Sequence, residues 1–225
     1  KISMLNELRR IGLQKVEEFA LSNIRRQSTT NFHNFDIDQF KKSELLANSK
    51  KPKISVLLNI LNKEFNYTLL NKNISNIYIP LKYFTLNNYE NTIKYLSDNF
   101  NTYIYIPTIV KANYRNLIIS NINKTLQNFK IKGFVISNIG NLELLNMLDI
   151  VLSNFEIIAN YTLNVYNLST VEKLKNLGIN TFTPSVELDK NTLINLCNYN
   201  ILSKELIVYG NIPLMNTRYC LLGKS

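Results

Sequence analysis

The chain alternates between strand-like and helix-like segments over most of its length, and this alternation constrains the fold more than any other feature. Runs rich in Ile, Val, Tyr and Phe recur at spacings of roughly 25 residues, and several lack the polar–apolar alternation of half-exposed strands. The predicted strands are Ile54–Ile60, Ile77–Leu81, Tyr103–Ile109, Gly133–Ser137, Glu156–Val165, Thr181–Val186 and Leu206–Tyr209. Helical patterns lie between them, at Tyr89–Phe100, Tyr114–Phe129, Leu142–Ser153, Thr170–Leu177 and Asn191–Tyr199.

About seven strand–helix repeats in one chain predict an α/β fold with a parallel sheet, and favour a partial (β/α)8, TIM-like barrel. The alternative is an open, Rossmann-like sheet. It is disfavoured because no Gly-x-Gly-x-x-Gly follows the first strand. The sequence shows no eighth strand, begins at Lys1 and stops at Ser225. We therefore interpret it as a C-terminally truncated piece of a longer protein.

The first 50 residues differ from the rest of the chain. Residues 1 to about 28 carry apolar side chains at helical spacing, such as Leu5, Leu8, Val16 and Phe19. The stretch from Arg25 to Lys53 is polar and reads as a linker, with one helical turn around residues 39–46. We therefore predict a helical extension and linker at 1–50 and a barrel-like domain at 51–225, with the boundary near Lys51.

Three local signals refine these elements. Ser169 followed by Glu172 three residues later predicts a capping box at a helix start. Asp189 is a candidate N-cap for the following helix, and Gly178 a candidate C′ residue for the preceding one. The β-branched run Leu206–Tyr209 predicts a buried seventh strand.

Composition excludes several classes of protein. No apolar run reaches the roughly 18 residues of a membrane span. Two cysteines do not make a disulfide-rich secreted scaffold, so we expect a reducing, cytoplasmic setting. The net charge of +10 suits a nucleic-acid partner, but abundant Lys and Asn also follow from A/T-rich codons. No zinc finger or RNA-binding aromatic motif accompanies the charge.

In a (β/α) barrel the carboxyl ends of the strands build the functional site. The residues at or just beyond these ends are mostly amides and hydroxyls, including Ser137 and Asn160, which suit directional hydrogen bonds to a polar polymer. The candidate substrate-binding residues are Asn138, Asn164, Asn167, Glu187, Tyr209 and Arg218. Chance placement is the alternative for each Asn, because Asn is abundant throughout the chain.

Residues for hydrolysis are hard to find. The single histidine, His33, lies in the polar linker, so no nucleophile has an obvious base. Neither a His-Glu-x-x-His motif nor a spaced set of carboxylates is present. Cys197 fits a helical core position, whereas Cys220 lies in a polar turn and is a candidate metal ligand. One thiol cannot hold a cubane iron–sulfur cluster, which takes about four protein ligands.

The run from Val208 to Gly223, VYGNIPLMNTRYCLLG, resembles the VYG-x-x-PLM-x-x-x-YC-x-x-G segment of the collagenase-like bacterial peptidases of family U32. Other pieces resemble the same family in the same order along the chain. They are Leu5–Arg10, Ser137–Gly140, Leu163–Asn167 and Thr183–Leu188.

The resemblance implies the C-terminal half of a large peptidase whose barrel binds a polypeptide and works with the N-terminal half of the parent protein. It also implies two alternatives. Relatives that support hydroxylation of RNA bases carry a [4Fe–4S] cluster, and their Tyr-Cys motif matches Cys220 here. A non-catalytic scaffold barrel is the other alternative. Because further cluster cysteines are missing, we expect this piece alone to be inactive and without a cofactor, and the cluster to belong to the full-length protein.

Overall fold

The computed structural model describes residues 2–24, 52–71 and 73–213. The chain divides into two compact units, residues 1–36 and 37–225. The first contains helix α1 (Ile2–Ile24), as the apolar spacing predicts, and every side chain of this helix is exposed. The predicted domain boundary near Lys51 and the turn at residues 39–46 lie outside the described residues. None of the described helices is both long enough and apolar enough to cross a membrane.

In the second unit, the described residues form a parallel sheet of seven strands whose spatial order is their sequence order. The strands are β1 (Ile54–Leu57), β2 (Ile74–Pro80), β3 (Asn101–Tyr105), β4 (Gly133–Ile136), β5 (Glu156–Ala159), β6 (Thr181–Phe182) and β7 (Ser203–Lys204). Each neighbouring pair is parallel. This order and direction confirm the predicted partial (β/α) barrel.

The sheet is curled rather than flat. In a flat sheet, strands spaced about 4.8 Å apart would put β2 and β7 roughly 24 Å from each other. Instead, the Tyr78 hydroxyl on β2 donates a hydrogen bond to Glu205 Oε1, directly after β7, at 2.8 Å. Only curvature brings these two strands within reach of one side-chain pair, so the face that carries Tyr78 is the concave, inner face.

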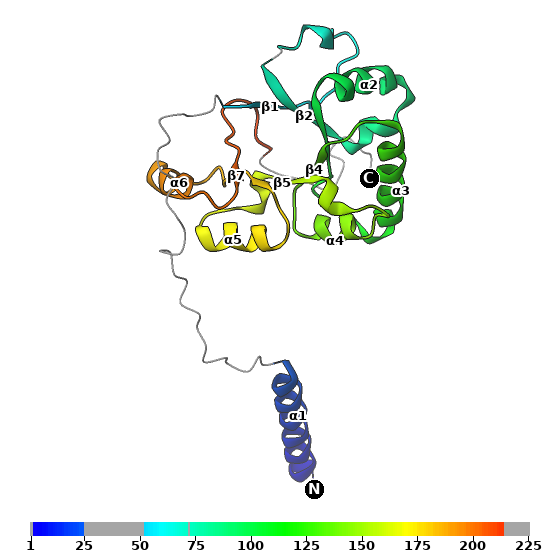
Figure 1. Ribbon diagram of the computed structural model, residues 1–225. Coiled ribbons are helices and arrows are strands. Elements are labelled where there is room, and N and C mark those ends of the chain that lie inside the picture. The colour runs from blue at the N-terminus through cyan, green and yellow to red at the C-terminus, as the bar shows by residue number, and fades with distance from the viewer. Residues whose placement is uncertain (1, 25–51, 72, 214–225) are drawn as a thin grey trace. The chain divides into compact units, whose positions relative to one another are not determined.

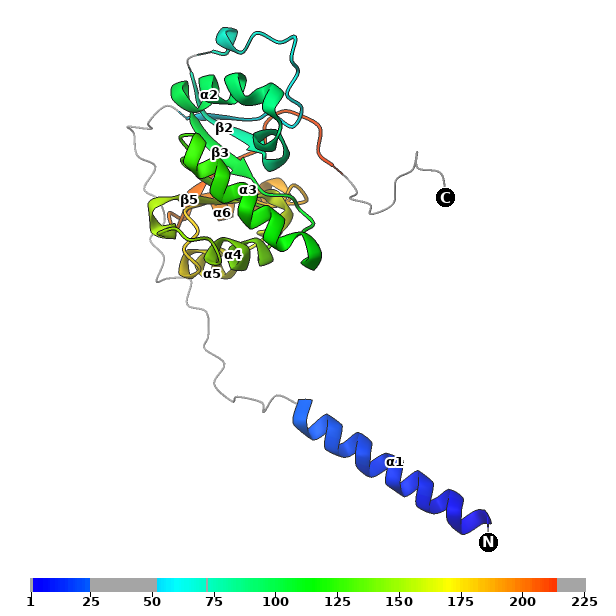
Figure 2. The ribbon, with the colours of Figure 1, turned by 90° about the vertical axis from the view of Figure 1, so that its right-hand side faces the viewer.

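The helices of this unit are α2 (Glu90–Asn99), α3 (Arg115–Asn128), α4 (Gly140–Asn146), α5 (Leu168–Asn176) and α6 (Lys190–Cys197). Figures 1 and 2 show α2 to α5 following one another along the outside of the strands. Two hydrophobic clusters fill the space between strands and helices. Outward strand residues such as Ile104, Phe134 and Phe182 are fully buried there.

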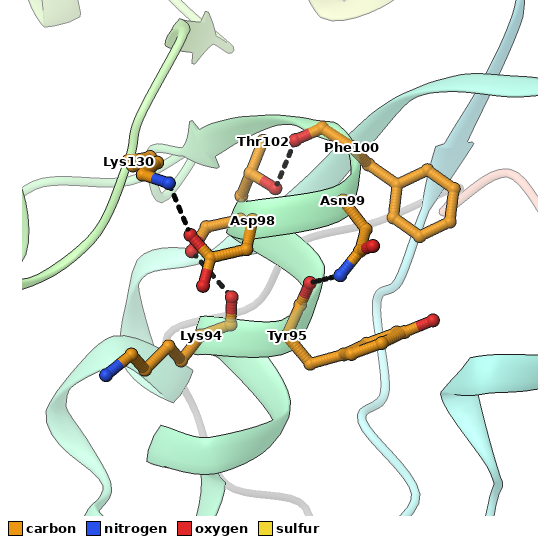
Figure 3. Close-up of polar contacts among 8 residues, drawn as sticks. Lys94, Tyr95, Asp98, Asn99, Phe100, Thr102 and Lys130 are labelled. Atoms are coloured by element: carbon orange, nitrogen blue, oxygen red, sulfur yellow. Dashed lines mark hydrogen bonds and ion pairs between the residues drawn. The ribbon is translucent and has the colours of Figure 1, made fainter.

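Figure 3 shows the polar contacts around the end of α2, just before β3 begins. Asn99 Nδ2 donates to the Tyr95 carbonyl oxygen at 2.8 Å, within the last turns of α2. The ammonium of Lys130, which precedes β4, lies 2.8 Å from Asp98 Oδ1. Both side chains are largely exposed.

The predicted buried strand at Leu206–Tyr209 is wrong. The seventh strand is the shorter and more polar Ser203–Lys204, and Val208 and Tyr209 are 92% and 97% exposed. Pairing with β6 ends at Glu205, whose N–H donates to the Phe182 carbonyl. Pro184, two residues beyond Phe182, has no N–H to continue the ladder, so the apolar run has no strand to pair with.

The helix ends test the capping predictions. Asp189 caps α6, because its carboxylate accepts from the N–H groups of Asn191 and Thr192. Gly178 follows α5 at φ +82°, as expected of a C′ glycine. The capping box at Ser169 is wrong. The N-cap of α5 is Asn167, which competes successfully because its amide oxygen already accepts from the N–H of Thr170.

Candidate functional site

The inner face of the sheet carries tyrosine hydroxyls and carboxylates, whereas its outer face is largely apolar. Tyr78, Tyr103, Val135 and Ile158 form a separate buried cluster there, with Tyr105 packed against it. These residues alternate along their strands with the outward core residues. The inner face therefore carries hydroxyls in the position where a closed barrel would hold its central side-chain layers.

A hydrogen-bonded chain of side chains begins at Tyr103. Its hydroxyl donates to Glu156 Oε2 at 2.6 Å, and Lys132 Nζ lies 3.2 Å from Glu156 Oε1. Burial opposes the ionisation of Glu156, but these two donors together outweigh it and hold its pKa below the usual glutamate value. Burial, and then the bond to Glu156, raises the pKa of Tyr103. The carboxylate is therefore charged and the phenol neutral at physiological pH.

Gly133 allows this contact. In the strand register Gly133 of β4 lies between Tyr103 of β3 and Glu156 of β5. A Cβ atom at this position would lie 1.9 Å from the backbone oxygen of Glu156. A side chain here would therefore clash with β5, and it would stand between the Tyr103 hydroxyl and its carboxylate partner.

Tyr78 continues the same set of side chains. Its ring meets that of Tyr103 edge-on, with centroids 5.3 Å apart and planes at 87°. Burial raises the pKa of Tyr78, and the nearby charge of Glu205 adds to this. The Tyr103–Glu156 and Tyr78–Glu205 pairs therefore form one connected set, because the two tyrosine rings are in contact. This set crosses the interior from β5, through β3 and β2, to the end of β7.

The carboxyl-terminal rim of the sheet carries a second polar group of residues. Asn160 follows β5, is 8% exposed, and donates through Nδ2 to the Tyr105 hydroxyl at 2.6 Å. Tyr105 ends β3, so its side chain spans β4 to reach Asn160. Tyr161 lies beside this pair. Burial raises its pKa, with a further contribution from Tyr105.

Ser137 directly follows β4, the strand that lies between β3 with Tyr105 and β5 with Asn160. Its N–H donates to Asn141 Oδ1 at 3.0 Å and its carbonyl accepts from Thr162 Oγ1 at 2.6 Å, so its backbone is fixed on both sides. Its side-chain hydroxyl is buried and has no hydrogen-bond partner among the described residues. Such a group costs about 1–3 kcal/mol, and it marks a place that a ligand or water would stabilise.

An apolar groove of about 330 Å³ lies where the chain leaves β3. Its lining is largely aliphatic, with Lys111 and Tyr114 as the polar members. The lining residues are Pro107, Ile109, Val110, Lys111, Tyr114, Leu117 and Ile118. Because Pro107 is two residues beyond Tyr105, the groove adjoins the polar rim.

The structure places the predicted Asn residues in loops, where they make local hydrogen bonds. Asn138 Nδ2 donates to the Thr108 carbonyl at 2.6 Å, and its Oδ1 accepts from the N–H of Asn141. Asn138 therefore ties the loop after β3 to the loop after β4. Asn164 is exposed and has a left-handed backbone at φ 50°, and Asn167 caps α5. Their substrate contacts stay a prediction.

The other predicted residues do not gather at one point. Glu187 is exposed and accepts a hydrogen bond from the Tyr166 hydroxyl at 2.5 Å. Tyr209 projects into solvent. Arg218 and Cys220 lie outside the described residues, so their roles stay predictions.

Sequence reasoning missed the Tyr–Glu pairs. Tyr103 and Glu156 are 53 residues apart, and Tyr78 and Glu205 are 127 apart, so no local motif joins them. The sequence signal that could have found them is the alternation of side chains along each strand. Tyr103 and Tyr105 lie two apart on β3, as do Glu156 and Ile158 on β5, which puts each pair on one face.

Comparison with known proteins identifies the family. Residues 79–225, more than half of the chain, match peptidase family U32. No curated protein matches the chain. Among solved structures the chain is similar to the U32 peptidase Mk0906, at 13% identity and a TM-score of 0.45, and the match covers 62% of each chain. The chain therefore spans less than two thirds of that protein's length. The family assignment rests on the match over residues 79–225, which shows that the chain belongs to peptidase family U32.

Proposed function

We propose that this chain is the substrate-binding barrel module of a collagenase-like U32 peptidase, and that it holds a polypeptide at the carboxyl-terminal rim of its sheet. The observation that carries the proposal is the apolar groove beside the rim formed by Tyr105, Ser137 and Asn160. An extended polypeptide needs both features, because its backbone amides seek directional partners while its side chains seek apolar pockets.

The lining of the groove favours a polypeptide over RNA. RNA binding depends on Lys and Arg for phosphates and on exposed aromatic rings for bases. Among the described residues that line the groove, Lys111 is the only cation, and the others apart from Tyr114 are aliphatic. Such a site suits an aliphatic side chain of a polypeptide better than a nucleotide.

The described residues supply groups for binding rather than a nucleophile with its base. Burial raises the pKa of Cys197, the one cysteine in the described part of the chain, so its thiol stays protonated at neutral pH. In the module we propose, the rim orients the substrate polypeptide, and other parts of the parent protein supply the groups that hydrolyse it.

An iron–sulfur cluster is not used in this mechanism. Within residues 2–24, 52–71 and 73–213 no three His, Cys, Asp or Glu side chains gather as a metal site would require. These residues therefore do not fit such a cluster by themselves. Cys220 as a ligand in the full-length protein remains a separate proposal, and iron analysis of an anaerobically purified Cys220→Ala variant of that protein would test it.

Binding of labelled polymers to the 225-residue chain tests the polypeptide proposal. Fluorescence anisotropy would follow a labelled gelatin peptide and a labelled single-stranded RNA. We compare the wild type with Ile109→Glu, which puts a charge into the groove, and with Val151→Glu as the matched control. Both positions are exposed, so neither change disturbs the core, and Val151 does not line the groove.

We expect the gelatin peptide to bind the wild type and Val151→Glu alike, and Ile109→Glu at least about tenfold more weakly, since an apolar peptide side chain in the groove would strip water from the new carboxylate. Equal binding by all three proteins would refute the groove as the site. RNA binding without peptide binding would favour the RNA-modification alternative. Binding of neither polymer would favour a scaffold barrel.

A further inference from the structure

The side-chain hydroxyl of Ser137 has no partner in the described structure, although every other polar group of this residue is used. Its N–H and carbonyl bond Asn141 and Thr162, and the side chain is 2% exposed. The residues of β4 alternate between the two faces, and Val135 is on the inner face, so Ser137 is also on it. Because Ser137 directly follows β4, this places its buried hydroxyl on the inner side of the rim.

Asn160 and Tyr105 lie on the same inner face. The N–H of Asn160 donates to the carbonyl of Ile136, which makes Asn160 the neighbour of Ser137 across the end of the β4–β5 pair. Tyr105 crosses β4 to accept from Asn160 Nδ2. The Oδ1 atom of Asn160 accepts no hydrogen bond from any described residue, so half of this carboxamide is unused.

We propose that Ser137 and Asn160 form a subsite for the backbone N–H and C=O of one residue of an extended polypeptide, and that the Tyr105 hydroxyl occupies it when no ligand is bound. The inference rests on the proposed function and deepens it. In an extended chain the N–H and C=O of one residue point to the same side, so a carboxamide can pair with both, from Asn160 Nδ2 to that carbonyl and from that N–H to Asn160 Oδ1. The Ser137 hydroxyl supplies the second donor to that carbonyl.

The site needs Tyr105 to move, and its attachment allows this. Among the described residues, the Tyr105 hydroxyl hydrogen-bonds to Asn160 alone, and an incoming amide carbonyl replaces that acceptor without loss. Removal of the Tyr105 ring from the rim also uncovers Ser137. The groove that begins at Pro107 then receives the aliphatic side chain next to the bound amide.

The proposal predicts effects of opposite sign for two neighbouring residues. Ser137→Ala removes a donor to the ligand and weakens binding, whereas Tyr105→Phe removes the competing hydroxyl and strengthens binding. Ser97→Ala is the matched control, because Ser97 is also a buried serine but lies in α2 and donates to the Lys94 carbonyl. Thermal unfolding of each variant shows that the fold is kept.

Two small probes isolate the backbone N–H. N-acetyl-leucine N-methylamide and its ester analogue O-acetyl-leucic acid N-methylamide share the side chain and both carbonyls, but the ester has an oxygen in place of the leucine N–H. NMR titration of the 225-residue chain gives their affinities. We expect the amide probe to bind about fivefold more tightly than the ester, about fivefold more weakly to Ser137→Ala, and about threefold more tightly to Tyr105→Phe. Ser97→Ala should match the wild type.

Several outcomes would overturn the subsite. They are equal affinities for amide and ester, a Ser137→Ala variant that binds like Ser97→Ala, or weaker binding by Tyr105→Phe. The gelatin experiment separates this failure from that of the proposed function. Gelatin binding that Ile109→Glu abolishes and Ser137→Ala leaves unchanged would keep the function and refute the subsite. Binding of the amide probe with the expected signs, but none of gelatin, would keep the subsite and refute the polypeptide function.

Discussion

The two faces of the curled sheet come from the same short strands but have different chemistry. On the outer face, Ile104, Phe134 and Phe182 are fully buried against helices. On the inner face, Tyr78 and Tyr103 are nearly as buried but bond carboxylates. Apolar burial is non-directional, while a hydrogen bond fixes its two partners. The outer face therefore supplies most of the stability, and the inner face fixes which strands lie opposite one another.

The largest test of this difference is Phe134→Ala on the outer face. Removing a fully buried ring leaves a cavity between β4 and the helices, and such changes cost about 3–5 kcal/mol. Urea unfolding would measure the loss, and Phe134→Leu, which retains much of the volume, should lose clearly less. A loss below that of the inner-face variant described next would contradict the assignment of stability to the outer face.

The inner-face counterpart is Tyr103→Phe, which keeps the ring and removes the hydrogen bond to Glu156. We expect a loss of about 1.5 kcal/mol, at the low end for a bond to a charged group, since Glu156 is partly exposed. Tyr95→Phe in α2 is the control, because no described residue bonds the Tyr95 hydroxyl. Equal losses for the two variants would show that the Tyr103–Glu156 pair contributes nothing specific.

A smaller effect is expected in the pH dependence of stability. The pKa of Glu156 is lower in the folded chain than its ordinary value of 4.5. Its contribution is therefore complete above about pH 4.5 and is lost as the pH falls through the lower, folded pKa. Urea midpoints measured from pH 6 downward should fall less steeply for Glu156→Gln than for the wild type. Parallel curves would mean that Glu156 titrates alike in the folded and unfolded chain.

The smallest effect is expected for Asp98→Asn, outside both faces. Asp98 pairs with Lys130 at the end of α2 (Figure 3), and the hydrogen bond from Lys130 lowers its pKa. Exposed pairs of this kind contribute little because water and salt screen them. The unfolding midpoint of this variant should agree with that of the wild type at 0.5 M salt. A loss that persists at high salt would require another role for this carboxylate.

The sequence predicts the outer face well and the ends of the sheet poorly. β2 to β5 carry β-branched and aromatic residues on both faces, so their position follows from composition alone. The last strand does not, because Ser203 and Lys204 have no strand signal while the exposed run Leu206–Tyr209 has a strong one. Whether a segment forms a strand depends on the strand beside it. Pro184 ends the pairing of β6 with β7, and no local pattern around Leu206–Tyr209 reveals this.

The candidate site could be predicted only as a location. The barrel rule places Ser137 and Asn160 at strand ends, where the structure has them. It cannot show that Tyr105 crosses a strand to Asn160, or that Ser137 keeps an unbonded hydroxyl, since both depend on packing between strands. The rule also selects residues with a local structural role. Asn164 lies in a turn with a left-handed backbone, and Asn167 caps α5.

The bond from Tyr78 to Glu205 has a consequence for the order of folding. It joins residues 127 positions apart, so almost the whole domain must be synthesised before it can form. Closing a loop of this length is entropically costly, and such contacts form late. On the ribosome, the strands up to β6 can assemble as an open arc, and the arc draws its two ends together only when Glu205 has emerged.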